Sequence, residues 1–543
     1  MVKEVQSSFT GGMCDTAAGG PVPADSYRYA ENLDFDNAVL TFRPQVAREL
    51  SQVFKQSLGL APLVNRGVFR HASGSYGDCV VVAAGDTGAD NVVFRCFRFD
   101  YSALADDSFR LEFPALYGHA DGCLWGDDGV AIGAPVVFLQ VGAAAYAWVP
   151  RGAEVLAFRW DGTVALGIGA LVQLPTVYGA GEGGVEWVPP CRAAAYAYGR
   201  VFCAVTSGGS QVYNSLAVSA PVTGNGNPRL MFDGVQLDIG LEFADDILGM
   251  CPVGGGRLLV FKRNSVWTVS GCDGAPGGMV CELLDAVRGC VGPSAFVPVG
   301  GAVWYASDDG IRKVEGSGAG NVSAAHVPLT APVGAFWSAR VTWPAGITPL
   351  ASAVICGSRV LFSLPLDSTA LNAVLVYSLA LGCWTGVWTG LNAGGLVVSQ
   401  LSGGPGLKML GPDGSLQRLL TARASLGNAV TARFVSRAFD GGVPDQTKLF
   451  LRSETALLSD ATRNDGTVEV PDWVDVPAVA DFRSLDHETG ASVTHLAGAS
   501  MSGAVTKLCV LGRVCRELSL DILFKSGIVR LRSLSVQSHP REQ

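Results

Sequence analysis

The chain has 543 residues, of which 48% are hydrophobic and only 16% charged, and its formal net charge is −9 at pH 7. This length predicts two to four domains, and so few charged residues predict that part of the surface is buried against other subunits. The acidic balance, without any long run of Lys or Arg, argues against a protein that binds nucleic acid through a basic surface.

The first segment, residues 1–58, is predicted to be an N-terminal arm that ends in a short helix. Residues 1–45 are rich in turn-forming residues and have little capacity to bury a core of their own, so we expect them to dock on a neighbouring subunit. Residues 45–57 (QVARELSQVFKQS) have the composition of a helix. The start of the chain lacks a signal-peptide pattern, and no uncharged apolar run reaches the roughly 20 residues of a membrane span.

Strand patterns dominate residues 59–428. Short runs of β-branched and aromatic residues are separated by turns rich in Gly, Asn and Asp. The clearest runs are 78–84, 91–99, 136–149, 153–160, 199–206, 256–271, 300–315, 357–364, 373–379 and 407–419. Several form hairpins that recur roughly every 45 to 60 residues, which is typical of a β-propeller with irregular blades. An array of β-sandwiches remains open, because no sequence signature repeats at a fixed interval.

The C-terminal part, residues 429–543, has longer segments and closes with strand patterns at 507–524 and 528–537. It is predicted to be a separate β-sandwich-like domain. Residues 368–373 are the one further predicted helix. The predicted fold class is therefore all-β: an extended N-terminal arm, an irregular β-propeller over 59–428 and a C-terminal β-sandwich-like domain.

The fourteen cysteines are scattered singly through apolar runs, and no Cys-x-x-Cys occurs. A disulfide scaffold needs a higher cysteine density in a shorter chain. We expect reduced, mostly buried thiols, as in a protein that folds in a reducing cytoplasm.

The histidines do not predict a metal site or a catalytic triad. They lie far apart, at His71, His119, His326, His487, His495 and His539. His487 and His495 are eight residues apart and could pair on a metal, but solvated surface histidines are the simpler interpretation. A Gly-x-Ser-x-Gly motif is absent, and the Gly-rich stretches lack the Lys-Ser/Thr of a phosphate-binding loop.

Three acidic pairs, 127–128, 245–246 and 308–309, are the residual sign of enzymatic chemistry. Paired carboxylates act in glycosidases and bind calcium, but Asp-Gly is also a common hairpin turn, and we favour turns. The tryptophans at positions 267, 304, 384 and 388 could stack on sugars, although packing between blades is the simpler interpretation. No catalytic, cofactor-binding or metal-binding residue is assigned, and the chain is predicted not to be an enzyme.

Three stretches resemble virion proteins of tailed bacteriophages. The first stretch comprises Phe9–Met13, Tyr29–Asn32 and Leu40–Pro44; the second comprises Phe243–Gly249, Leu258–Trp267, Gly289, Gly292, Ser294 and Asp308–Ile311; the third comprises Ser436–Phe439 and Lys448. The second stretch is the most specific, and it is similar to blades of tail nozzle, or tail tubular, proteins of short-tailed phages.

The resemblance implies a structural subunit of the phage tail, assembled in the host cytoplasm. It implies a ring, with a hexamer expected, that continues the DNA exit channel and contacts neighbouring tail, adaptor and fibre proteins. DNA would pass without specific binding, and no cofactor is implied. Other functions stay open: a glycan-binding or glycan-cleaving propeller at the virion periphery, a capsid decoration protein, or an unrelated bacterial propeller.

Overall fold

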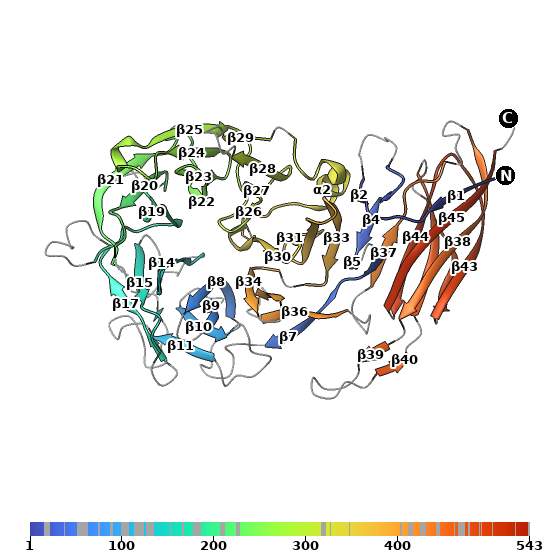
Figure 1. Ribbon diagram of the computed structural model, residues 1–543, viewed down its shortest axis with the longest axis horizontal. Coiled ribbons are helices and arrows are strands. Elements are labelled where there is room, and N and C mark those ends of the chain that lie inside the picture. The colour runs from blue at the N-terminus through green and yellow to red at the C-terminus, as the bar shows by residue number, and fades with distance from the viewer. Residues whose placement is uncertain are drawn as a thin grey trace.

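The computed structural model of the protein consists of a ring of β-sheets and a β-sandwich that lie side by side (Figure 1). Strands account for 62% and helices for 4% of it, so the predicted all-β class, with a propeller and a C-terminal sandwich, is confirmed. The structure describes residues 1–15, 22–36, 39–50, 63–73, 77–86, 91–98, 108–112, 124–125, 135–151, 154–164, 168–176, 186–206, 212–223, 229–316, 322–325, 327–346, 348–391, 393–401, 404–410, 416–423, 431–440, 446–460, 462–464, 473–475, 478–487, 489, 491–501, 503–526 and 528–540.

Seven blades of antiparallel strands form the ring within these residues. Blade one contains β8 (Leu63–Ser73), β9 (Gly77–Asp86), β10 (Asn91–Arg98) and β11 (Ser108–Glu112), with β12 (Leu124–Trp125) and β16 (Ile168–Ala170) at its edges. Blade two contains β13 (Val137–Val141), β14 (Ala144–Arg151), β15 (Glu154–Trp160) and β17 (Val172–Leu174). Blade three contains β18 (Ala194–Ala197), β19 (Arg200–Val205), β20 (Ser215–Ser219) and β21 (Phe232–Asp238).

The remaining four blades follow in chain order. Blade four contains β22 (Ile247–Val253), β23 (Arg257–Lys262), β24 (Val266–Ser270) and β25 (Val280–Asp285), and blade five contains β26 (Phe296–Val299), β27 (Ala302–Ser307), β28 (Gly310–Gly316) and β29 (Val322–Ala324). Blade six contains β30 (Ala353–Cys356), β31 (Arg359–Leu364), β32 (Ala373–Ser378) and β33 (Cys383–Thr389), and blade seven contains β34 (Leu396–Leu401), β35 (Gly404–Leu410), β36 (Leu416–Arg423) and β7 (Pro44–Leu50).

The ring is closed by a strand from the other end of the chain. The innermost strand of each blade contacts the next blade, and β34 of the last blade lies beside β8 of the first. The outer strand of blade seven is β7, which pairs antiparallel with β36. The helix predicted over residues 45–57 is therefore wrong up to Leu50, because the open edge of the blade offers this segment a ladder of backbone hydrogen bonds. Residues 51–57 lie outside the described residues.

Apolar side chains fill the spaces between blades. Separate clusters of buried residues join blades one and two, two and three, three and four, and six and seven, while the largest joins blades four to six to the sandwich. The tryptophans that could have been sugar platforms belong to this packing. Trp384 and Trp388 are fully buried, and Trp267 and Trp304 are at most 8% exposed.

The sandwich is made of two facing sheets. One contains β43 (Gly503–Cys515), β38 (Lys448–Asp460), β45 (Ile528–Pro540), β6 (Val39–Phe42), β5 (Leu33–Asp36) and β1 (Val2–Gln6). The other contains β4 (Tyr29–Glu31), β37 (Ala432–Val435), β44 (Leu518–Ser526), β41 (Ala478–Asp486) and β42 (Ser492–Met501). The short pairs β2 (Gly12–Met13) with β3 (Ser26–Tyr27), and β39 (Thr462–Asn464) with β40 (Trp473–Asp475), complete the described strands.

Propeller and sandwich share one continuous sheet. Strand β4 lies between β33 of blade six and β37 of the sandwich, so a nine-stranded sheet crosses the junction. Asn32 follows β4 with φ 55° and is buried. Its side-chain amide donates to Thr389 Oγ1 and to the Thr431 carbonyl, each at 2.8 Å, and its carbonyl oxygen accepts from Arg43 Nε at 2.9 Å.

The N-terminal segment is thus used within its own chain. Its strands enter both sheets of the sandwich and then blade seven, and Figure 1 shows β7 running from the sandwich to the lower rim of the ring. These strands pack within the chain without a neighbouring subunit, and docking of residues 1–45 on such a subunit stays a prediction. The stretches that suggested a phage arm, Tyr29–Asn32 and Leu40–Pro44, form part of this junction.

Smaller features also bear on the sequence-based expectations. Residues 368–373 are not helical: the Asn372 side chain bonds both the N–H and the carbonyl of Leu366 and holds a turn there. The helical elements are η2 (Pro276–Gly278), η3 (Ala331–Val333), α2 (Gly334–Arg340) and η4 (Thr348–Leu350) in the described residues. The described cysteines are thiols rather than disulfides, and most are buried. No helix in the described ranges is long and apolar enough to cross a membrane.

Candidate functional site at the propeller mouth

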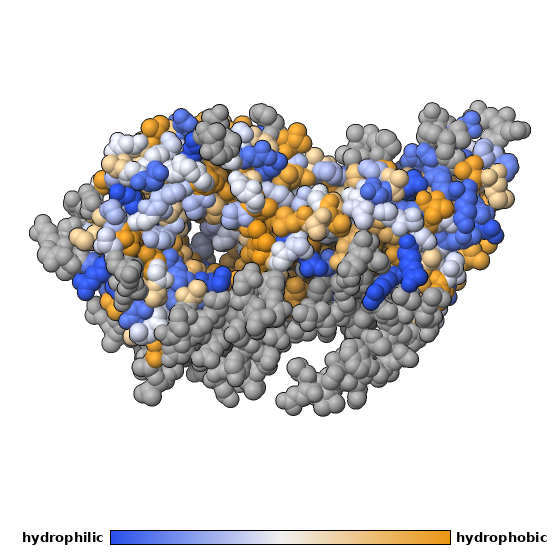
Figure 2. Space-filling model, viewed as in Figure 1, coloured by the Kyte–Doolittle hydropathy of each residue, from blue (hydrophilic) through white to orange (hydrophobic). Residues whose placement is uncertain are grey.

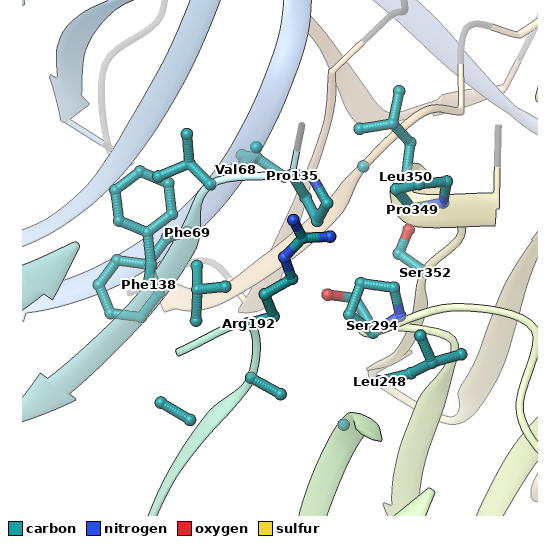
Figure 3. A pocket seen from close by; sticks show the side chains of 18 of the residues that line it. Val68, Phe69, Pro135, Phe138, Arg192, Leu248, Ser294, Pro349, Leu350 and Ser352 are labelled. Atoms are coloured by element: carbon teal, nitrogen blue, oxygen red, sulfur yellow. The ribbon is translucent and has the colours of Figure 1, made fainter. Parts of the chain in front are cut away.

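A narrow cavity runs along the axis of the ring. Its volume is about 180 Å³, and residues of all seven blades line it. Small and apolar residues, among them Gly67, Gly249 and Gly395, allow the inner strands to approach closely. Figure 3 shows the side chain of Arg192 in the middle of this cavity, between Phe138 on one side and Ser294 on the other. A hollow at the centre of the ring is open on the face seen in Figure 2.

A wider cavity of about 530 Å³, which we call the mouth cavity, adjoins the axial one and shares Arg192 with it. Its lining comes mainly from segments that lead into the innermost strands of blades two to six. These lining residues are Pro135, Arg192, Asp246, Pro293 and Pro349. The long connection between β29 and β30, which contains α2, adds Trp343 to the wall.

Arg192 and Asp246 are both placed through Tyr213. The guanidinium of Arg192 lies over the Tyr213 ring, with Cζ 4.9 Å from its centroid. Asp246 Oδ1 accepts a hydrogen bond of 2.8 Å from the Tyr213 N–H. Within the described part of the chain, no carboxylate lies at ion-pair distance from Arg192. An exposed guanidinium at the head of a channel therefore remains free to bind an anion.

A buried lysine fixes the loop that carries Asp246. Lys262 is fully buried, and its Nζ donates to the carbonyls of Gly240 at 3.0 Å and Phe243 at 3.3 Å. Its Nζ also lies 3.6 Å from Asp245 Oδ1. Burial lowers the pKa of Lys262, and Asp245 opposes that effect. Three contacts to one short loop limit the positions that Asp246 can take.

Arg263 follows Lys262 in the turn between β23 and β24. One of its two terminal guanidinium nitrogens is paired and the other is not. Its Nη2 forms an ion pair of 2.6 Å with Asp308, whose side chain is 64% exposed. Its Nη1 is shielded from solvent and has no hydrogen-bond partner in the described structure. A buried polar group in this state is costly unless water or a ligand completes it.

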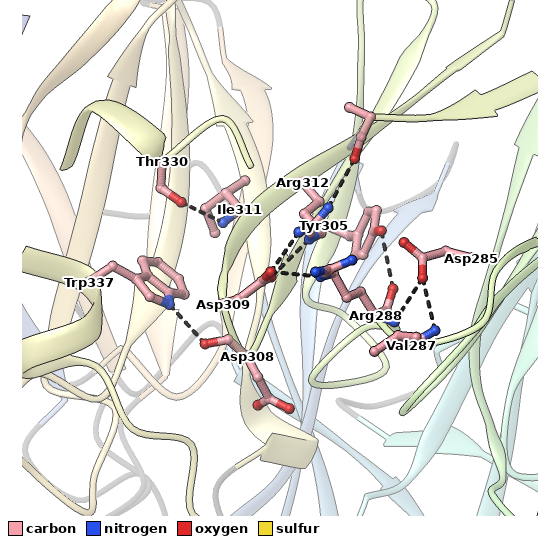
Figure 4. A network of polar contacts seen from close by, with 11 residues as sticks. Asp285, Val287, Arg288, Tyr305, Asp308, Asp309, Ile311, Arg312, Thr330 and Trp337 are labelled. Atoms are coloured by element: carbon pink, nitrogen blue, oxygen red, sulfur yellow. Dashed lines mark hydrogen bonds and ion pairs between the residues drawn. The ribbon is translucent and has the colours of Figure 1, made fainter. Parts of the chain in front are cut away.

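Asp308, the ion-pair partner of Arg263, lies in the turn between β27 and β28, which polar contacts hold in place (Figure 4). Asp309 accepts hydrogen bonds from Arg312 at 2.6 and 2.8 Å and from Arg288 at 2.9 Å. The bond from Arg312 is the main reason that the pKa of Asp309 lies below its usual value. The Asp308 carbonyl accepts from Trp337 Nε1 at 3.0 Å. Asp308 is therefore held in place while it orients the guanidinium of Arg263.

Trp343 contributes a second unbonded donor. Its Nε1 is shielded from solvent and lacks a hydrogen-bond partner, whereas the Nε1 of Trp337 donates to Asp308. Arg263 and Trp343 both line the mouth cavity, but these two N–H groups are themselves shielded. A polar ligand reaches either group only if the side chain turns toward the cavity.

The sequence-based candidates are only partly brought together here. Of the acidic pairs, Asp246 lines the mouth cavity, Asp308 lies beside it through Arg263, and 127–128 lie outside the described residues. His487 and His495 are in the sandwich, and both are half-buried and bonded to serines rather than solvated. No group of His, Cys, Asp or Glu in the described ranges could hold a metal ion. The sequence patterns did not indicate Arg192 or Trp343 as site residues.

Comparisons with known proteins complete the description. No family model matches the chain, and no curated protein matches it either. Among solved structures, it is similar to an exo-β-1,3-galactanase from Phanerochaete chrysosporium, at 11% identity over 88% of this chain and 96% of that one, with a TM-score of 0.27. It is also similar to the extracellular domain of a hybrid two-component system from B. thetaiotaomicron, at 10% identity over 90% and 61%, with a TM-score of 0.40.

A third similar structure is a glycoside hydrolase family 43 arabinoxylan arabinofuranohydrolase from Bacillus subtilis, at 10% identity over 76% and 96%, with a TM-score of 0.22. These findings contradict the assignment to a phage tail, since the similar structures are glycoside hydrolases and a sensor domain. The predicted DNA-channel ring and the prediction that the chain is not an enzyme are corrected with it. At such low identity and overlap, the likenesses carry no argument about activity.

Proposed function

We propose that the mouth cavity binds an acidic carbohydrate. The observation that carries the proposal is that two guanidinium groups, those of Arg192 and Arg263, line one cavity whose described lining holds a single carboxylate, Asp246. Because Arg263 is already paired with Asp308, the uncompensated positive charge is that of Arg192, and it favours a ligand with a carboxylate or another anionic group. Arg192 is exposed and has no ion-pair partner among the described residues, so it can donate to such a ligand.

The other walls fit the rest of a sugar. A cavity of about 530 Å³ is in the size range of small-molecule sites and would hold one or two sugar rings. Asp246 can accept hydrogen bonds from hydroxyl groups, and the indole of Trp343 forms part of the wall. Proline rings at positions 135, 293 and 349 supply flat apolar surface for C–H faces.

A direct binding measurement tests the proposal. Oligosaccharides of galacturonate or glucuronate should bind by calorimetry, and their neutral galactose or glucose counterparts should bind at least about 10-fold more weakly, since a charge-assisted hydrogen bond contributes about 1.5–3 kcal/mol. Arg192→Gln should cost a similar factor. Arg452→Gln is the control, because Arg452 is half exposed on the sandwich, away from the cavity. Equal affinity for neutral and acidic sugars, or no loss in Arg192→Gln, would overturn the proposal.

Cleavage of the bound glycan is a second candidate function, favoured by the position of Asp246. Glycoside hydrolysis ordinarily uses a pair of carboxylates on either side of the bond. Asp246 can supply one of them, and the second must come from outside the described lining. Incubation with polyuronides should then release new reducing ends, and Asp246→Asn should abolish the release while leaving binding within a few-fold. Glycan binding without release of reducing ends would show that the cavity binds the glycan but does not cleave it.

A further inference from the structure

Three exposed apolar side chains of the sandwich lie on one strand. On β43, Leu508 is 60% exposed, Val510 is 82% exposed and Val514 is 46% exposed. The alternate residues Cys509 and Leu511 point into the core and are at most 6% exposed. The strand therefore has an apolar face on both sides, which is unusual for a strand with one side in water.

This strand is also the edge of its sheet. In the described structure β38 is the one strand that pairs with β43, through a ladder that runs from Lys448 opposite Cys515 to Ser459 opposite Gly503. On its other side β43 has no strand partner there, although His495 of β42 interacts with the backbone of Val510. A long apolar edge without a strand partner is the feature that proteins usually avoid, because it pairs readily with another strand.

The rest of the same sheet face is polar and internally paired. Lys3 forms an ion pair of 2.6 Å with Glu454, and Arg452 Nε donates to Gln537 at 2.8 Å. Figure 2 shows strongly hydrophilic residues together with apolar ones at this end of the molecule. Because the charges of the neighbouring strands are already satisfied, the edge offers a partner apolar side chains and backbone groups rather than charge.

We propose that β43 pairs antiparallel with β43 of a second copy of the chain. A two-fold axis at Cys509 places Leu508 opposite Val510 of the second copy, and the same pair recurs on the other side of the axis. In this register Lys507 lies opposite Leu511, so no like charges meet. An axis at Val510 would place Lys507 opposite Arg513, and this register is disfavoured because like charges directly opposite each other repel.

The pairing joins two sandwich sheets into one and leaves both propellers free. A single strand pair with its flanking side chains lies at the low end of interface sizes, well below the roughly 1,600 Å² of a standard interface. We therefore expect a dimer in the micromolar range rather than a tight one. The inference is independent of the ligand proposed for the mouth cavity.

Sedimentation of the intact chain across a concentration series tests the dimer. The wild type should pass from monomer to dimer between about 1 and 100 μM, as expected for weak interfaces. Val510→Lys should stay monomeric, because two charged groups would then lie in the apolar centre of the pairing. Val172→Lys is the matched control: Val172 is 60% exposed on β17 of the propeller rim, and this variant should dimerise like the wild type.

Cross-linking tests the register. In the double variant Leu508→Cys with Val510→Cys, mild oxidation with copper phenanthroline should give a disulfide-linked dimer, because the two positions face each other across the axis. Leu508→Cys alone should cross-link poorly, since its copies would be offset by two residues and their Cα atoms more than about 7 Å apart. A wild type that stays monomeric at 100 μM, or a dimer insensitive to Val510→Lys, would overturn the proposal. The partner of β43 would then have to be a strand of a different protein.

Discussion

The arginines of the junction and those of the mouth cavity differ in their carboxylate partners. At the junction, Arg433 meets Asp521 through two hydrogen bonds of 2.9 and 3.0 Å, and Arg359 meets Asp34 at 2.6 Å. Both carboxylates are at most 3% exposed. At the mouth, Arg192 has no carboxylate within ion-pair distance in the described part of the chain, and Arg263 has one that is mostly exposed.

This difference separates positive charge that stabilises the sandwich and its junction with the propeller from positive charge that is available to a ligand. A buried carboxylate needs its guanidinium, because an ion left alone in a protein interior is strongly destabilising. A guanidinium at the rim of a cavity is hydrated, does not need a paired carboxylate, and can exchange its water for an anion. Variants that remove one partner in each region should therefore change different properties, namely stability at the junction and binding at the mouth.

The largest effect is expected at the junction. Arg433→Met leaves the Asp521 carboxylate buried without its partner, and we expect the sandwich to lose about 3–5 kcal/mol in urea unfolding. Arg452→Met, at a half-exposed arginine of the same domain, should cost less than about 1 kcal/mol. Adding Asp521→Leu to Arg433→Met should recover most of the loss. A loss in Arg433→Met no larger than in Arg452→Met would show that the pair does not stabilise the junction.

The next effect comes from pH. Burial is the main reason that the pKa of His487 falls from 6.5 to about 4, with Arg28 adding to the shift, and its Nε2 lies 2.6 Å from Ser519 Oγ. Above pH 6.5 the ring is neutral in both the folded and the unfolded chain. Between pH 6.5 and 4 the unfolded chain takes up a proton that the folded chain does not, so stability falls as the pH falls, by up to about 3 kcal/mol.

His487→Gln should remove this contribution while keeping a hydrogen-bonding group near Ser519. The measurement is the difference between the wild type and the variant in unfolding free energy at pH 7 and at pH 4, which cancels the titration of the other groups. Equal pH dependence in the two proteins would show that His487 is already accessible to protons in the folded state.

Much of the fold could be predicted from the sequence, because most strands are short runs of β-branched and aromatic residues between turn-forming residues. The hairpin at 256–271 and the one at 300–315 are formed by β23 with β24 and by β27 with β28. The exception, residues 45–50, has a helical composition but completes blade seven. A local pattern cannot show that a sheet hundreds of residues away lacks its last strand, so the tertiary contact overrides the propensity there.

The site was harder to predict, because its residues have no common spacing. Arg192, Asp246 and Trp343 come from three connections and meet only when the ring closes. The acidic pair at 245–246 is visible in the sequence. Nothing in the sequence indicates that Asp245 pairs with Lys262 while Asp246 lines a cavity. The resemblance to phage proteins drew on residues such as Asn32 and Arg43, whose observed contacts stabilise the junction.

A smaller effect tests how the mouth is held, and it depends on the proposed acidic glycan. Lys262→Met removes the Nζ contacts to Gly240 and Phe243 and should free the loop that carries Asp246. We expect affinity to fall about 10-fold, which corresponds to about 1.4 kcal/mol. Lys408→Met is the control, because Lys408 is also buried but lies on β35 of blade seven and does not line the mouth cavity. Unchanged affinity in Lys262→Met would show that other contacts fix the loop.

The smallest effect is expected from two tryptophans that differ in one hydrogen bond. Trp337 Nε1 donates to the Asp308 carbonyl, so Trp337→Phe should lower stability by about 1 kcal/mol. Trp343 Nε1 has no partner in the described structure, so Trp343→Phe should leave thermal stability unchanged. If the ligand completes that donor, Trp343→Phe should instead weaken glycan binding by about 2- to 10-fold, the range of a single neutral hydrogen bond. Melting and calorimetry on both variants give four values, and the proposal requires the stability loss in one variant and the binding loss in the other. A Trp343→Phe protein that melts early and binds normally would place its N–H in the structure rather than in the site.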